Sequence, residues 1–237
     1  MSYYIQMRSG KVVDPFALRA EDVVLDDIVN NLAHEVRFGG NVGVWTVAEH
    51  TLVVAELVRK FGKGTDEEHK SALLHDAGEA YLKDMPKPIK HRPDMLAYRQ
   101  AEERAIRVIC EKFGVPSNLP IVKEMDNVAT YLEAKMFLGT LSECWTQWEP
   151  EITADVLRVG IDAILHIEKL PEGAKLEWQG WMQNYFGAPQ RRAAPPLISQ
   201  RSDLGDSFEA QLAEELGLSG EQRERLGRWL KARKEKG

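Results

Sequence analysis

Apolar residues recur at helical spacing over most of the chain, and segments that favour β-strands are few. Val24, Ile28 and Leu32 stand four residues apart within segment 21–35, which carries acidic residues in its first turn, as a helix dipole prefers. Residues 4–13 fit one short hairpin that turns at a Ser-Gly pair. The pattern therefore predicts an all-α fold, a helical bundle with a possible short β-hairpin near the N-terminus.

Two sequences of the form Thr-x-x-Glu, at residues 46–49 and 65–68, have the pattern of a capping box and should each open a helix. The first helix should run to about residue 61. The second should continue to about residue 84, because the two prolines that follow at once cannot continue a helix. The glycine-rich run RFGGNVGVW, which precedes the first box, is predicted to be a loop.

Further helices are predicted over 92–114, 120–139, 151–169 and 172–187. After Gly187 the composition shifts to APQRRAAPPLISQRSDLGD, which is typical of a linker. Two short amphipathic helices are expected beyond it. The predicted organisation is a helical domain over 1–187, a linker over 188–206 and a C-terminal helical tail over 207–237.

The charge of the chain is acidic and uneven. The formal net charge is −6; residues 219–237 hold seven Lys/Arg and three Glu, a net of +4, which leaves −10 on the first 218 residues. An acidic domain argues against a nucleic-acid polymer as the partner. The basic tail fits a solvated helix face or a contact with an acidic partner, and the sequence leaves both open.

The sequence also bears on the compartment. No run of 18 apolar residues exists, so no transmembrane helix is expected, and the N-terminus lacks the apolar stretch of a signal peptide. The two cysteines, Cys110 and Cys144, stand alone in apolar helical stretches. A disulfide framework is therefore not expected, and a cytoplasmic location is.

The stretch LLHDAGEAYLKDMPKPIK, residues 73–90, places polar groups beside an apolar run. Burying an unpaired carboxylate costs several kcal/mol, so buried charges are usually paired or bound to metal. On one helix His75 and Asp76 would both reach one ion, with Glu79 one turn further along. His50, in the preceding helix, and Asp126, inside an apolar segment, would complete a set of nitrogen and oxygen ligands for a divalent metal. A purely structural His–Asp pair is the alternative.

The other histidines have less chemical context. His69, His91 and His166 have charged or partly polar neighbours and are predicted to lie at the surface, and His34 at a helix end.

The order His50, His75-Asp76, Asp126 resembles the H…HD…D signature of the HD-domain metal-dependent phosphohydrolase superfamily. The runs RFGGNVGVWTVAEHTLVVAELV, HDAGEAYLKDMPKPIK and KEMDNVATYLE are similar to the YfbR-like 5'-deoxynucleotidases and their phage-associated relatives. This resemblance covers residues from about 20 to about 185. It implies an HD-domain helical bundle and a homo-oligomer.

The resemblance also implies roles for particular residues. His50, His75, Asp76 and Asp126 match metal ligands for Zn, Mn, Co, Ni or Mg. Glu79 and Asp84 match the carboxylates beside the attacking water and the scissile phosphate. Three further residues match positions that contact the substrate. Arg37 matches the arginine that holds phosphate, and Lys90 matches the last residue of a D-x-P-x-P-x-K loop. Phe38 stands at a position where the nucleotidases commonly have tryptophan.

The activity that these matches imply is release of phosphate from deoxynucleoside 5'-monophosphates. A dNTP (dATP-type) triphosphohydrolase, which would release triphosphate, is the nearest alternative. An inert binding or regulatory module with the same fold is a second alternative.

Overall fold

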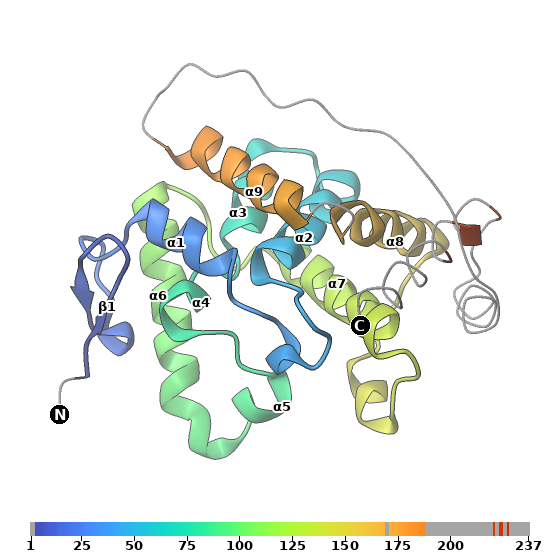
Figure 1. Ribbon diagram of the computed structural model, residues 1–237, viewed down its shortest axis with the longest axis horizontal. Helices are drawn as coiled ribbons and strands as arrows, with labels where there is room; N and C mark the ends of the chain where they lie inside the picture. The colour runs from blue at the N-terminus through green and yellow to red at the C-terminus, as the bar shows by residue number, and fades with distance from the viewer. Residues whose placement is uncertain (1–2, 169–170, 188–219, 221–222, 225–226, 228–237) are drawn as a thin grey trace.

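The computed structural model describes residues 3–168, 171–187, 220, 223–224 and 227 (Figure 1). Helices make up most of this part of the chain, and its one small sheet is a two-stranded antiparallel hairpin. The predicted all-α fold with a short N-terminal hairpin is therefore confirmed. The predicted linker and most of the predicted tail lie outside the described residues.

The hairpin joins β1 (Ile5–Gln6) to β2 (Val12–Val13), with Ile5 opposite Val13. Gly10 in the turn has a φ of +88°, a conformation that glycine adopts without steric cost. The seven longer helices that the structure describes are α1 (Leu25–Leu32), α2 (Val47–Phe61), α3 (Asp66–Leu74), α6 (Leu96–Phe113), α7 (Pro120–Leu138), α8 (Ala154–Glu168) and α9 (Pro171–Phe186). Two short helices, α4 (Glu79–Leu82) and α5 (Lys87–Lys90), connect α3 to α6.

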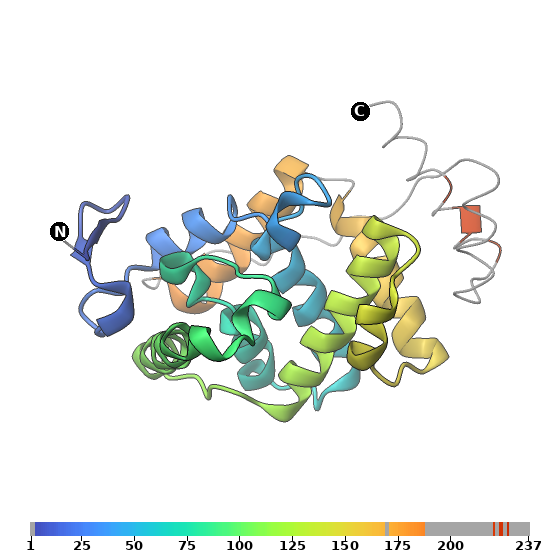
Figure 2. The same cartoon turned by 90° about the horizontal axis from the view of Figure 1, so that it is seen from below.

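Helix α2 lies at the centre of the domain and packs against α3, α7, α8 and α9 (Figure 1). Its apolar residues face every neighbour, and Val53, Val54 and Leu57 are fully buried, as expected of a helix that is apolar on nearly all sides. Figure 2 shows the short helix α5 between α6 and α7. The central helix thus brings α3 and α7 to its two sides.

Helix α2 begins with the predicted capping box. The Thr46 hydroxyl accepts a hydrogen bond from the Glu49 backbone N–H at 3.2 Å, and the Glu49 carboxylate accepts one from the Thr46 backbone N–H at 2.6 Å. The second box forms only in half: the Thr65 hydroxyl accepts from the Glu68 backbone, but the Glu68 carboxylate accepts from the Lys63 backbone at 2.7 Å instead. Both helices start where the sequence predicts.

Replacing Thr46 with alanine should lower the free energy of unfolding by about 1 to 2 kcal/mol, because the first turn of α2 loses its cap. Thermal or urea denaturation would measure the loss. Thr140→Ala, at an exposed threonine, is the matched control and should change stability far less. Equal stabilities of the two variants would contradict the importance of this cap.

The helix predicted to continue to about residue 84 ends at Leu74, so that prediction is wrong. The His75 ring Nδ1 lies 2.7 Å from the carbonyl oxygen of Ala72 and competes for the backbone acceptor of the last turn. The next turn is tighter: the Ala77 N–H donates to Leu74 and the Glu79 N–H to Asp76, both across three residues and at 3.0 Å. This break turns the chain before α4 begins.

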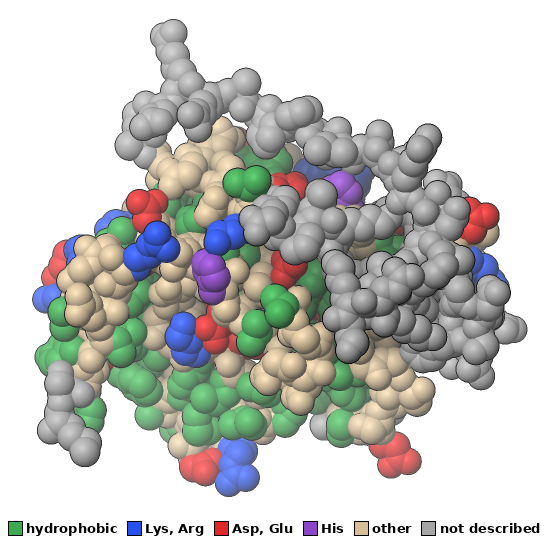
Figure 3. Space-filling view, in the orientation of Figure 1, with side chains coloured by type: hydrophobic (Ala, Val, Ile, Leu, Met, Phe, Trp, Pro, Cys, Tyr) green, Lys and Arg blue, Asp and Glu red, His purple; other side chains and the backbone are tan. Residues whose placement is uncertain are grey.

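The described surface carries both signs of charge. On the face drawn in Figure 3, acidic and basic side chains are interspersed rather than grouped by sign. Within the described part of the chain, every helix is too short or too polar to cross a membrane.

Candidate metal centre

Three of the predicted ligands converge from three helices. His50 lies on α2, His75 caps the end of α3 and Asp126 lies on α7. One ligand atom from each lies within 4.8 Å of the other two. His50 is fully buried, whereas His75 and Asp126 are partly accessible. The group could therefore hold a metal ion that remains open on one side.

Both imidazoles are oriented by their Nδ1 atoms. His50 Nδ1 lies 2.7 Å from Glu133 Oε1, and His75 Nδ1 lies 2.7 Å from the Ala72 carbonyl oxygen. Because both partners are hydrogen-bond acceptors, each Nδ1 carries a proton and each Nε2 faces the cluster. His75 Nε2 is buried and makes no hydrogen bond of good geometry, although a carboxylate oxygen of Asp76 lies 3.2 Å away. Metal-binding histidines are commonly held in this way, so the donor set fits a metal.

Asp76 faces the same two imidazoles. Its Oδ2 lies 3.2 Å from His75 Nε2 and 3.7 Å from His50 Nε2. Burial acts to raise the pKa of Asp76, but the charge of His75 outweighs it and holds the pKa below its usual range. The fourth predicted ligand is thus ionised and lies beside both histidines, but it is outside the group of three whose ligand atoms lie within 4.8 Å of one another.

The cluster attracts positive charge strongly. Burial acts to lower the pKa of His75, yet the carboxylates of Asp76 and Asp126 raise it to about 9. For Asp126, burial acts to raise the pKa, and a hydrogen bond from His50 with the charge of Lys87 holds it well below its usual value. Carboxylates that stabilise a proton on His75 this strongly also favour a divalent cation. The proton and the cation compete for the same atom, His75 Nε2.

Two further carboxylates behave in the opposite way. Glu79 is 4% exposed, and its Oε2 has no hydrogen-bond partner. Burial, with the charges of Asp76 and Asp84 added, raises the pKa of Glu79 well above its usual value. Burial also raises the pKa of Asp84, against the opposing charge of Arg37. Neighbouring carboxyl groups with pKa values moved in opposite directions are typical of an acid–base site.

The side chains predicted to bind substrate already contact other side chains of the protein. The Lys90 ammonium donates to Glu102 Oε1 at 2.5 Å and lies 3.9 Å from Glu79 Oε1. The Phe38 ring lies 6.4 Å from the ring of Trp145. Phe38 has a φ of +56°, which is strained for a bulky residue and must be held by its surroundings.

Arg37 is 7% exposed and enclosed. Its Nη2 donates to the Thr130 hydroxyl at 3.0 Å, and its Nε lies 3.3 Å from Glu133 Oε2. Burial opposes the charge of the guanidinium, but the carboxylates of Glu133 and Asp76 outweigh it and raise the pKa of Arg37 above its ordinary value. Arg37 therefore stays charged and is held by Thr130 and Glu133, the residues that contact Asp126 and His50.

Helix α7 supplies two residues that the sequence analysis missed. Asp126, Thr130 and Glu133 follow one another at four and three residues, so they share one face of the helix. Thr130 donates to Asp126 Oδ1 at 3.3 Å, and Glu133 accepts from His50. A signal for Glu133 was present, because it stands between the apolar residues of YLEA and seven positions after Asp126, on the same helix face.

We expect Glu133→Gln to weaken metal binding by about 10- to 100-fold, the usual cost of losing a carboxylate that supports a metal-binding histidine. Titration with Mn²⁺ would measure the affinity. The ¹⁵N shifts of His50 in metal-free protein would report whether Nδ1 still carries the proton. Glu67→Gln, at an exposed position on α3, should leave both readouts unchanged. An unaltered affinity in Glu133→Gln would leave Glu133 with a packing role alone.

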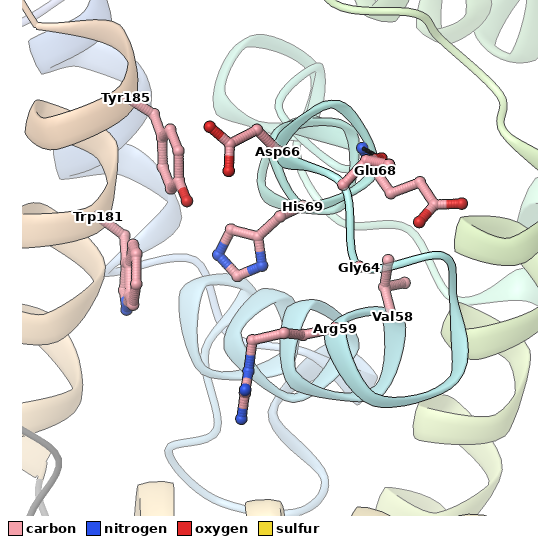
Figure 4. A pocket seen from close by; sticks show the side chains of 9 residues that line it. Val58, Arg59, Gly64, Asp66, Glu68, His69, Trp181 and Tyr185 are labelled. Carbon is pink, nitrogen blue, oxygen red and sulfur yellow. Dashed lines mark hydrogen bonds between the residues drawn. The ribbon is translucent and has the colours of Figure 1, made fainter.

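A separate cavity of about 140 Å³ lies between α9, the end of α2 and the start of α3 (Figure 4). His69 lines it and is only 9% exposed, so its predicted surface position is wrong. The reason is α9: the rings of Trp181 and Tyr185 lie 5.1 and 5.5 Å from the His69 ring. Burial lowers the pKa of His69. None of the residues predicted to bind metal or substrate lines this cavity.

The fold and the cluster together define an all-α protein with a candidate metal centre. Its sequence matches no protein-family model. It is 33% identical over 143 residues to the uncharacterized protein RCAP_rcc00048 of Rhodobacter capsulatus, across 56% of this chain and 72% of that protein. It is also 36% identical over 115 residues to the uncharacterized protein YfdR of Escherichia coli, across 48% of this chain and 60% of that protein. The chain belongs to the family of the Rhodobacter protein.

Proposed function

We propose that this protein is a metal-dependent phosphohydrolase of the HD-domain superfamily that removes phosphate from deoxynucleoside 5'-monophosphates. The observation that carries the proposal is the convergence of His50 Nε2, His75 Nε2 and an Asp126 oxygen, with both Nδ1 atoms held by acceptors. The similarity of the surrounding motifs to the 5'-deoxynucleotidases supplies the substrate class.

His50, His75, Asp76 and Asp126 would hold the divalent cation. When bound, such an ion lowers the pKa of a coordinated water from about 15.7 towards 7 and polarises a phosphoryl oxygen. The ligand atoms are nitrogen and carboxylate oxygen, a set that suits zinc, manganese, cobalt or nickel, with magnesium favouring oxygen more strongly.

The two carboxylates of raised pKa supply proton transfer in this proposal. Glu79, with a buried oxygen that lacks a partner, orients the attacking water and accepts its proton. Asp84, which is half-buried, protonates the departing sugar oxygen or binds the sugar. General acid–base assistance of this kind typically contributes 10²- to 10⁴-fold.

The test is product analysis with the full chain, purified without chelator and then supplied with Mn²⁺ or Co²⁺. Inorganic phosphate released from dAMP is the expected result. Triphosphate released from dATP, with no action on dAMP, would identify a dNTP triphosphohydrolase instead. Protein that binds no divalent metal and hydrolyses neither nucleotide would favour the inert binding module.

A further inference from the structure

Lys87 occupies a position beside the metal cluster that the sequence motif did not single out. It lies on α5, and its ammonium donates to Asn127 Oδ1 on α7 at 3.1 Å. The same ammonium lies 3.7 Å from Asp126 Oδ2. The Lys87 side chain is 33% exposed, so a solute can reach it. An accessible cation thus lies next to a predicted metal ligand.

The other cations near the cluster are already engaged. The Arg37 side chain is 8% exposed, and its guanidinium faces Thr130, Glu133 and Asp76 on three sides. The Lys90 side chain is 16% exposed and is held by a carboxylate 2.5 Å away. Of these three cations, Lys87 has the largest exposed fraction and the weakest ion pair. It can change partner at the lowest cost.

We propose that Lys87 is the side chain that contacts the phosphate group of the substrate, and that Arg37 supports the ligand cluster from within. This inference rests on the proposed function and deepens it. Asp126 is both a predicted ligand and the neighbour of Lys87, so an anion bound at the metal centre lies beside the Lys87 ammonium. A lysine offers three donors and a compact charge, which suits a phosphate dianion without requiring one fixed geometry.

Binding of inorganic phosphate to the Mn²⁺-loaded full chain tests this role without turnover. By isothermal titration calorimetry, Lys87→Met should bind phosphate about 10- to 100-fold more weakly than the unmodified chain, the cost of one hydrogen bond to a charged group. Lys87→Arg should retain most of the affinity. Lys60→Met, at an exposed lysine in the last turn of α2, controls for the change in net charge and should bind phosphate normally.

Mn²⁺ affinity is measured separately on each variant. Lys87→Met should bind Mn²⁺ as tightly as the unmodified chain or more tightly, because a positive charge beside Asp126 is removed. Equal phosphate affinity in Lys87→Met and the unmodified chain, or no phosphate binding by either, overturns the proposal. If phosphate binding depends on Lys87 but no nucleotide is hydrolysed, the proposed function fails and Lys87 remains an anion ligand.

Discussion

Asp126→Asn is expected to abolish metal-dependent activity and to weaken metal binding by about 100-fold or more. Loss of a residue that only supports a metal ligand costs about 10- to 100-fold, and loss of a ligand should cost at least the upper end of that range. The substitution keeps the shape of the side chain and removes only its charge. Metal content after dialysis against Mn²⁺, and phosphate release from dAMP, are the two measurements. Asp155→Asn, at a side chain that is 82% exposed on α8, should match the unmodified chain in both.

Stability separates loss of the metal from loss of the fold. Because the pKa of Asp126 is held below its usual value, its ionised form stabilises the metal-free fold above the unfolded pKa, and this contribution disappears as the pH falls through the folded pKa. Metal-free Asp126→Asn should therefore melt at a lower temperature at neutral pH.

The decisive readout is the response of that melting temperature to metal. Added Mn²⁺ at about 100 times its dissociation constant should stabilise the unmodified chain by about 2.7 kcal/mol. Because the variant binds Mn²⁺ about 100-fold more weakly or worse, the same addition should stabilise Asp126→Asn by only about 0.4 kcal/mol or less. A full metal-induced rise in that variant would place the ion elsewhere.

Local sequence rules predicted much of the fold. The threonine cap at residue 46 starts α2, and Pro120 starts α7, because both signals act through neighbouring backbone groups. His50 and Asp126 could be chosen from the sequence because each is a polar residue inside an apolar helix. Their convergence follows from packing those apolar faces against one core.

The rest depends on contacts between distant parts of the chain. The break after Leu74 arises because the His75 side chain takes a backbone carbonyl, and helical spacing carries no sign of it. His69 is buried by α9, which lies more than 100 residues further along the chain. The enclosure of Arg37 requires Glu133 to face inward from α7. A sequence motif can identify residues that lie together at one site, but it does not show which of them would contact the substrate and which hold other side chains in position.

Glu79→Gln should lower kcat by about 10²- to 10⁴-fold while the metal content stays the same. Glutamine has nearly the same size as glutamate and still accepts a hydrogen bond, but it cannot take a proton from water. Glu79 is 4% exposed, and burial raises its pKa well above the usual value. Removal of its charge should therefore relieve a buried repulsion with Asp76 and Asp84 rather than unfold the chain.

Three measurements on Glu79→Gln distinguish a proton acceptor from a structural residue. Metal content and KM for dAMP should stay within about threefold of the unmodified chain, so that the loss falls on kcat and marks an interaction made in the transition state. The melting temperature should be equal or higher. Glu67→Gln, on the exposed face of α3, serves as the matched control for one lost carboxylate. A kcat that stays within threefold of the unmodified chain would remove Glu79 from the reaction and leave proton transfer to Asp84.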